Sequence, residues 1–366
     1  MPHSLISILD EWQTCEGWNL SRRRAFPIPR QREPDSDKRN LMQVEIRRVN
    51  WQFASEFRIS YEVRSQAETV LVEMEDGDLV GRGEALGVSY HAETADSLVE
   101  QLMAIRAELS CGIPRAKLAE LLPPGGARNA VDCALWDLEA KRSGLRAWEL
   151  AGMHAVKPLL TAYTLSMDTP EAMNRAAAAV KQYSLLKLKL GGEGDRERVA
   201  AVRAARPDAR IIVDANQCWS ESQLYEIVPA LSALGVELIE QPLPVGKDGV
   251  LVEFASPVPL CADESCQTAE SLPSLLGKYQ YVNIKLDKTG GLTEALRLAQ
   301  VATAQHFKLM VGCMAGSSLS MAPAFIVGQI CSVIDLDGPL LASSDVTHGI
   351  RYEGSRMFAP EPALWG

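Results

Sequence analysis

Three acidic residues follow short apolar segments in the second half of the chain, and their order points to a metal site. Asp214, Glu240 and Asp263 each end a run rich in Ile, Leu, Val or Ala, the composition of a buried strand. Ends of adjacent parallel strands lie about 5 Å apart, so the three carboxylates would converge. Converging carboxylates repel one another unless a proton or a cation lies among them. An all-oxygen set favours Mg²⁺, although each residue alone is also typical of a helix cap.

Lys189 and Lys285, which lie on two other segments, are placed to work as acid and base at that site. Lys187 and Lys189 alternate with a leucine, so both side chains point to one face of a strand. Lys285 ends the sixth of the apolar segments, four after the segment of Lys187 and Lys189. In a barrel closed by eight strands, these two segments lie on opposite sides. A nearby cation disfavours a charged lysine and lowers its pKa toward the range of a general base. Two facing bases suit the removal of a proton from one side of a carbon and its return to the other. A single lysine at a strand end is also commonly a solvated rim residue.

The elements that must position these residues are eight short apolar segments, which begin roughly 21 to 27 residues apart. Their ranges are 161–166, 185–190, 211–214, 236–240, 260–263, 281–285, 308–311 and 332–335. Helical periodicity separates most of them, which predicts parallel pairing and a (β/α)8-type barrel. Barrel enzymes place their active sites at the carboxyl ends of the strands, where the acidic and basic residues lie. An open doubly wound sheet is the rival fold, but no Gly-x-Gly-x-x-Gly motif supports it.

The preceding part of the chain has the pattern of a smaller α+β domain. Residues 44–49 and 69–74 alternate apolar and polar side chains, and the turn at 75–78 separates two strands of a hairpin. Helical spacing of Leu98, Leu102 and Ile105 follows. A second helix, through residues 130–140, is expected to end near Gly144.

Length and charge limit the class of protein. The chain has 366 residues and a net charge of −10, which favours two domains and disfavours nucleic-acid binding. No apolar segment is long enough for a membrane helix. The scattered cysteines and the absence of a secretory signal pattern predict a cytoplasmic protein with reduced thiols. Residues 1–41 are expected to be a flexible extension, with a small anion contact at Arg22, Arg23 and Arg24 as the alternative.

Several motifs together resemble the enolase superfamily in its muconate-lactonizing subgroup, and most closely its L-Ala-D/L-Glu dipeptide epimerases. The motifs are GGARNAVDCALWDL at 125–138, IIVDAN at 211–216, EQPLP at 240–244, CADESC at 261–266, VNIKLDKTGGLTEAL at 282–296 and DLDGP at 335–339. The resemblance covers residues 43–345. It implies an enolase-type (β/α)7β barrel with an N-terminal α+β capping domain. The expected division is a capping domain at 42–155, a barrel at 156–340 and a C-terminal return to the cap at 341–366.

The resemblance also implies a role for each motif residue. Asp214, Glu240 and Asp263 match the Mg²⁺ ligands, and Lys189 and Lys285 match the two acid/base lysines. The remaining positions match substrate-binding residues, namely Lys187 for the carboxylate, Asp335 and Asp337 for a free α-ammonium group, and Arg64 for a glutamate side chain. A turn after a strand is the alternative for Asp335 and Asp337, and a surface ion pair is the alternative for Arg64. Loops near 57–65, 87–91 and 312–318 are expected to line the substrate, with His91 at the interface of cap and barrel.

The implied activity is Mg²⁺-dependent epimerisation of a small dipeptide by 1,1-proton transfer through an enolate. An N-acyl amino acid racemase of the N-acetylglutamate type is the nearest alternative, because it needs the same fold and the same two lysines. Cycloisomerisation, o-succinylbenzoate synthesis and a non-catalytic binding barrel are the others. The sequence leaves the oligomeric state open, including a homo-oligomer.

Overall fold

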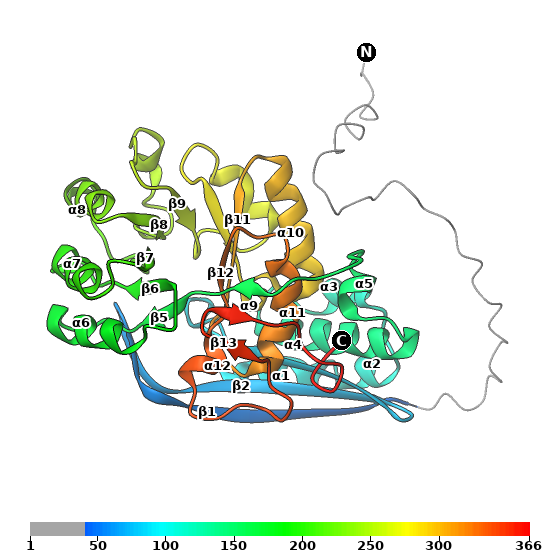
Figure 1. Ribbon diagram of the computed structural model, residues 1–366. Helices are drawn as coiled ribbons and strands as arrows, with labels where there is room; N and C mark the ends of the chain where they lie inside the picture. Colours follow the sequence, from blue (N-terminus) through cyan, green and yellow to red (C-terminus); the bar gives the residue numbers. More distant parts are fainter. Residues whose placement is uncertain (1–40) are drawn as a thin grey trace, which may run out of the picture.

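A computed structural model describes residues 41–366, which form an antiparallel sheet with its helices and a parallel eight-stranded sheet (Figure 1). The flexible extension predicted for residues 1–41 and the anion contact at Arg22, Arg23 and Arg24 concern residues 1–40, which lie outside the described residues.

The antiparallel sheet is a meander of three long strands. β1 spans Gln43–Ile59, β2 spans Glu62–Asp76 and β3 spans Leu79–Leu86, and each pairs with the next. The predicted turn between β2 and β3 is confirmed, and Gly77 there has a φ of 61°, which a glycine adopts without strain. The turn between β1 and β2 lies at the far end of the sheet, beside β5 and α6 in Figure 1.

Helices cover one face of this sheet. The longest is α4, at Gly126–Ser143, and it ends at Gly144 in the left-handed conformation, as the sequence predicts. Leu98 and Leu102 of α1 are fully buried, also as predicted. The other helical elements of this part are η1 (Ser89–His91), α1 (Ala95–Ala104), α2 (Arg106–Ser110), η2 (Arg115–Lys117), α3 (Leu118–Leu121) and α5 (Ala147–Leu150).

All eight predicted barrel strands are present, and they pair in parallel in chain order. They are β5 (Tyr163–Leu165), β6 (Leu185–Lys189), β7 (Arg210–Asp214), β8 (Val236–Glu240), β9 (Leu260–Ala262), β10 (Tyr281–Ile284), β11 (Lys308–Gly312) and β12 (Val333–Asp335). The sheet curves back on itself, because Thr161, just before β5, forms a parallel bridge with Ile334 of β12. The expected enolase-type barrel is therefore confirmed.

The connections between these strands are not uniform, which the periodicity had not resolved. Only 3₁₀ turns, η3 (Gly249–Val252) and η4 (Ala269–Ser274), connect β8 to β9 and β9 to β10. The other connections carry α-helices, which are α6 (Pro170–Ala179), α7 (Asp195–Ala205), α8 (Glu221–Ala233), α9 (Leu286–Thr289), α10 (Leu292–Ala304) and α11 (Ser318–Gly328). After β12 comes only the short α12 (Gly338–Leu341), so the barrel is of the expected (β/α)7β type, with 3₁₀ turns in place of two of its helices.

Side chains inside the barrel form two layers that are offset by two residues. The lower one, here called the apolar layer, consists of Ala162, Leu185, Ile212, Leu238, Cys261, Met310 and Val333. Because alternate residues of a strand point the same way, the positions two further along also face inward. These positions are Thr164, Lys187, Asp214, Glu240, Asp263, Gly312 and Asp335, here called the polar layer. The same step from Tyr281, which packs on the apolar layer, leads to Asn283.

α4 joins the antiparallel sheet to the barrel. Its Asn129 donates a hydrogen bond of 2.8 Å to Asp287, the first acidic residue of α9. Asp287 also accepts the backbone N–H of Leu86 at 3.0 Å. This bond fixes the end of β3 beside Asp287, which follows Lys285 by two residues in the sequence. The carboxylate of Asp132 accepts two hydrogen bonds from Thr293 of α10, at 2.9 and 2.6 Å. Polar contacts therefore set the position of β3 over the mouth of the barrel.

The last part of the chain runs back across both units. β13 (Tyr352–Glu353) pairs with β14 (Arg356–Met357), which in turn pairs with β4 (Leu159–Leu160). The terminal residues then contact α4, where Trp365 donates to the carbonyl of Cys133 at 3.1 Å and Gly366 donates to Asp137 at 2.6 Å.

Within residues 41–366, no helix has both the length and the apolar character that crossing a membrane requires. The seven cysteines of that range are all free thiols.

The packing of β3 on α4 gives a first prediction. A Cβ at Gly83 would press on the carbonyl of Ala130 and lie 2.8 Å from the backbone nitrogen of Ala134. Gly83→Ala is expected to lower the free energy of unfolding by about 1–3 kcal/mol, because the helix must move away from the sheet. Gly249→Ala is the control, since its Cβ meets nothing within 4 Å. Equal midpoints of thermal unfolding for the two variants would contradict this account.

Candidate active site

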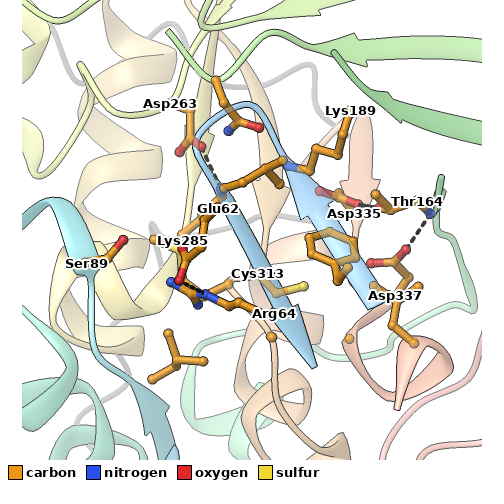
Figure 2. Close-up of a pocket in the computed structure, with 18 of the residues that line it drawn as sticks. Glu62, Arg64, Ser89, Thr164, Lys189, Asp263, Lys285, Cys313, Asp335 and Asp337 are labelled. Carbon is orange, nitrogen blue, oxygen red and sulfur yellow. Dashed lines mark hydrogen bonds and ion pairs between the residues drawn. The ribbon is translucent and has the colours of Figure 1, made fainter. Parts of the chain in front are cut away.

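The polar layer opens into a pocket between the barrel mouth and the hairpin of β1 and β2 (Figure 2). Of the residues singled out from the sequence, Lys189, Asp263, Lys285, Asp335, Asp337 and Arg64 line it. Lys187, Asp214 and Glu240 are buried in the polar layer and do not line the pocket.

The three predicted metal-binding carboxylates converge as expected. Asp214 ends β7, Glu240 ends β8 and Asp263 follows β9, so the three lie on neighbouring strands. One oxygen from each lies within 4.8 Å of the others, and all three residues are at most 1% exposed. No other set of three His, Cys, Asp or Glu residues within the described part of the chain has this geometry.

Lys187 lies among these carboxylates. Its Nζ atom is 2.6 Å from Asp335 Oδ2, 2.7 Å from Glu240 Oε2 and 3.2 Å from Asp214 Oδ2. Burial lowers the pKa of this lysine, but the surrounding carboxylates outweigh burial and raise the pKa well above its ordinary value. Lys187 is therefore a fixed positive charge, and it connects the acidic cluster to Asp335.

Lys189 and Lys285 approach the cluster from opposite strands of the barrel. Lys189 at the end of β6 contacts Asp214 Oδ2 at 2.6 Å, and Lys285 after β10 contacts Asp263 Oδ2 at 2.6 Å. Burial lowers the pKa of Lys285, but the charges of Asp263 and Glu240 raise it well above its usual range. This direction is opposite to the lowering expected from the sequence. That expectation concerned a lysine beside a bound cation, whose charge offsets these carboxylates.

The donor set fits a small hard cation. Burial and the charge of Asp214 raise the pKa of Glu240 to about 8, so this carboxylate is poorly compensated by the chain's own groups. Its buried Oε2 atom accepts no hydrogen bond, because the nearby Lys187 ammonium has ion-pair distance without hydrogen-bond geometry. Three convergent carboxylates without nitrogen or sulfur donors are the ligand chemistry of Mg²⁺.

The second acidic pair lies across the pocket from Lys285. Asp337 accepts the backbone N–H of Thr164 at 2.6 Å, and Asp335 accepts the Thr164 hydroxyl at 3.5 Å (Figure 2). Asp335 is also paired with Lys187, whereas Asp337 has no ion pair with any residue in the range 41–366. Burial and the charge of Asp335 raise the pKa of Asp337 to about 7.

Arg64 lines the pocket but is already paired. Its Nε atom lies 2.6 Å from Glu62 Oε1 on the same strand, β2, and both side chains are about one third exposed. Figure 2 shows the pair on the hairpin that passes over the pocket. The hairpin is held to the barrel by Arg58, whose backbone N–H donates to Ser166 at 2.6 Å. The predicted loop at 57–65 therefore reaches the site, and His91 is exposed beside Tyr90 rather than in the pocket lining.

Several pocket residues had no assigned role from the sequence. Thr164, Tyr61 and Tyr90 line the pocket, and burial raises the pKa of Tyr61 to about 12. Asn216 and Glu264 also line the pocket, and the amide of Asn216 donates to Glu264 at 3.4 Å beside Asp263. Thr164 lies two residues after Ala162 of the apolar layer, so strand alternation alone identifies it as an inward-facing residue at the barrel mouth. Tyr61 and Tyr90 belong to the loops at 57–65 and 87–91 that the resemblance predicts to line the substrate, and both side chains reach the pocket.

Comparisons with known proteins agree with this architecture. The profile described as "Mandelate racemase / muconate lactonizing enzyme, N-terminal domain" matches residues 41–152, and the one described as "Enolase C-terminal domain-like" matches residues 171–361. An N-acetyl-D-glutamate racemase of Pseudoalteromonas sp is 44% identical over 81% of this chain and 95% of its own length. An L-Ala-D/L-Glu epimerase of Escherichia coli (strain K12) is 42% identical over 84% of this chain and 97% of its own length.

Solved structures give the same relation. An enolase family member from Agrobacterium tumefaciens, with bound sodium and L-Ala-L-Glu, is 43% identical with a TM-score of 0.87, over 89% of this chain and all of that one. A dipeptide epimerase from Enterococcus faecalis V583, complexed with Mg and L-Leu-L-Tyr, is 27% identical with a TM-score of 0.82, over 88% and 98% of the two chains. The chain therefore belongs to the enolase superfamily, in the family of mandelate racemase and muconate lactonizing enzyme.

Proposed function

We propose that the protein is a Mg²⁺-dependent epimerase of small dipeptides of the L-Ala-D/L-Glu type. The observation that carries the proposal is the arrangement of two lysines and an unpaired carboxylate around one pocket. Relatives of 42% and 44% identity are named as an epimerase and a racemase of glutamate-containing molecules, which supports an isomerase acting on amino acid derivatives.

The proton is moved by Lys189 and Lys285. They lie on β6 and after β10, on opposite sides of the barrel, so a substrate α-carbon between them meets one amine on each face. One lysine in its neutral form removes the proton from one face, and the other, as an ammonium, donates a proton to the opposite face. This exchange inverts the carbon without any covalent bond to the protein.

The acidic cluster would hold the reacting carboxylate through a bound cation, and Lys187 supports this with its positive charge. Asp214, Glu240 and Asp263 would bind Mg²⁺, which supplies positive charge for the enolate oxygens that form when the proton leaves. Lys187 adds a permanent positive charge within 3.2 Å of Asp214 and Glu240. Each pocket lysine is at most 8% exposed, so water competes little for these charges.

Asp337 favours a dipeptide over an N-acyl amino acid. Its carboxylate faces the pocket with one backbone hydrogen bond and no cationic partner in the described chain. The free α-ammonium group of a dipeptide would supply that charge, in an ion pair shielded from water. An N-acetyl group would place a methyl beside Asp335 and Asp337 and leave the charge of Asp337 uncompensated. We assign the glutamate side chain of the substrate to Arg64, which must exchange Glu62 for it.

N-acetylglutamate racemisation is the second candidate. It is supported by the 44% identity to an N-acetyl-D-glutamate racemase and uses the same lysines and the same metal ligands. The two functions differ only in what lies next to Asp335 and Asp337.

The two-base assignment predicts the behaviour of the lysine variants. Lys189→Ala and Lys285→Ala are each expected to reduce epimerisation by a factor of about 10² to 10⁴, because one face loses its proton carrier. Each variant should still exchange the α-proton of one epimer with D₂O, because the other lysine remains. Nuclear magnetic resonance of L-Ala-D-Glu and of L-Ala-L-Glu in D₂O measures both. Lys181→Ala, at an exposed position outside the pocket lining, is the control. Undiminished epimerisation by either pocket variant would exclude the mechanism.

Asp337→Asn separates the two candidate substrates. The amide keeps the size of the side chain but removes the charge that pairs with an ammonium group. We expect kcat/KM for Ala-Glu to fall at least tenfold, while any turnover of N-acetylglutamate stays the same or rises. A loss restricted to N-acetylglutamate would favour the racemase instead.

The raised pKa of Asp337 predicts a pH dependence of dipeptide binding. With a pKa of about 7, this carboxyl is protonated below that pH and charged above it. The KM for Ala-Glu should therefore fall as pH rises through 7, and rise again above about 8, where the free α-amino group loses its proton. In Asp337→Asn the branch at lower pH should be absent. The same branch in both proteins would assign it to another group.

A further inference from the structure

Each of the three convergent carboxylates has one oxygen held by a donor from the chain itself. Asp214 Oδ1 accepts the backbone N–H of Asn216 at 3.0 Å, and Glu240 Oε1 accepts the amide of Asn283 at 2.8 Å. Asp263 Oδ1 accepts the ammonium of Lys288 at 2.5 Å. The second oxygens, Oδ2 or Oε2, face Lys189, Lys187 and Lys285 respectively.

Lys288 has no donor left for a substrate. It is fully buried on α9, and its three acceptors are Asp263 Oδ1, the carbonyl of Asp263 at 2.5 Å and the carbonyl of Asn283 at 3.0 Å. An ammonium group has three N–H donors, so these contacts use all of them. Lys288 does not line the pocket, and the proton transfer does not need it.

Asn283 is confined in the same way. It occupies the position above Tyr281 on β10 and is fully buried. Gly312 on the neighbouring strand leaves room for it, because a Cβ there would lie 2.8 Å from the Asn283 amide and 3.1 Å from Cε of Lys285. Its Oδ1 atom has no hydrogen-bond partner, and the side-chain hydrogen bond of Asn283 is the one that its amide donates to Glu240.

We propose that Lys288 and Asn283 are positioning residues that hold Asp263 and Glu240 with a single oxygen each toward the cation, and so make the site select Mg²⁺ over Ca²⁺. The inference rests on the proposed metal site. Ca²⁺ takes six to eight oxygens, often with bidentate carboxylates, whereas Mg²⁺ requires a compact octahedral shell of single oxygens. A carboxylate whose second oxygen is bound to the chain cannot rotate to chelate the larger ion. Partners of metal ligands commonly set affinity in this way.

The test measures the two metals separately on the full chain without substrate. Isothermal titration calorimetry gives the dissociation constants of Mg²⁺ and Ca²⁺ for the wild-type protein, Lys288→Met and Asn283→Leu. Removal of Lys288 also removes a positive charge, which strengthens the binding of both dications alike. The ratio of the two constants is therefore the informative quantity, and in each variant we expect the preference for Mg²⁺ to fall by about tenfold.

Lys278→Met is the matched control, because it also removes a lysine paired with a buried carboxylate. Lys278 contacts Asp248 at 2.9 Å, away from the three converging carboxylates. Circular dichroism establishes that each variant is folded, and Asn283→Leu decides the question if Lys288→Met is not. An unchanged ratio in the folded variants, or no preference for Mg²⁺ in the wild type, would overturn the inference. If the ratio shifts as expected while Ala-Glu is not turned over, the proposed substrate is wrong and the positioning role stands.

Discussion

The structure depends on the mutual compensation of charges buried at the barrel mouth. Four carboxylates, of Asp214, Glu240, Asp263 and Asp335, lie among four ammonium groups, of Lys187, Lys189, Lys285 and Lys288. A charge buried without a partner costs several kcal/mol, so none of these residues is tolerable alone. On the proposed function the balance also holds in the reactive state. A dication adds two positive charges, which the substrate carboxylate and the conversion of one lysine to its neutral form offset. The cation thus favours the neutral lysine that the chemistry needs.

Strand geometry makes this cluster possible. The apolar layer fills the barrel, and a step of two residues along each strand changes an apolar side chain to a polar one at the same inward position. The charged side chains therefore extend from strands and pack on the apolar layer, rather than lying on flexible loops. β3 and the β1–β2 hairpin cover the mouth, held there by α4 and by contacts such as that of Asp287 with Leu86. The pocket is consequently lined by side chains of the barrel and of two cap loops.

This division explains why relatives with different substrates resemble the chain almost equally. An epimerase of dipeptides and a racemase of an N-acylated amino acid both need proton transfer at the carbon beside a carboxylate, and the barrel supplies that. On the proposed function, the difference is expected among the side chains around the rest of the substrate. Asp337, with no cationic partner in the described chain, is the group here whose charge an ammonium would balance.

The sequence by itself determined the eight barrel strands, the three carboxylates that converge at their ends and the two lysines beside them, because period-two alternation and strand-end residues are local patterns. It also placed the end of α4 at Gly144. It did not reveal the 3₁₀ connections around β9, and it left Arg64 between a substrate contact and the ion pair that the residue makes with Glu62. It gave Asn283 and Lys288 no role, since their partners Glu240 and Asp263 lie 43 and 25 residues away. Hydrogen bonds and charge balance between distant segments exist only once the barrel has closed and the cap has docked, and tertiary structure alone decides them.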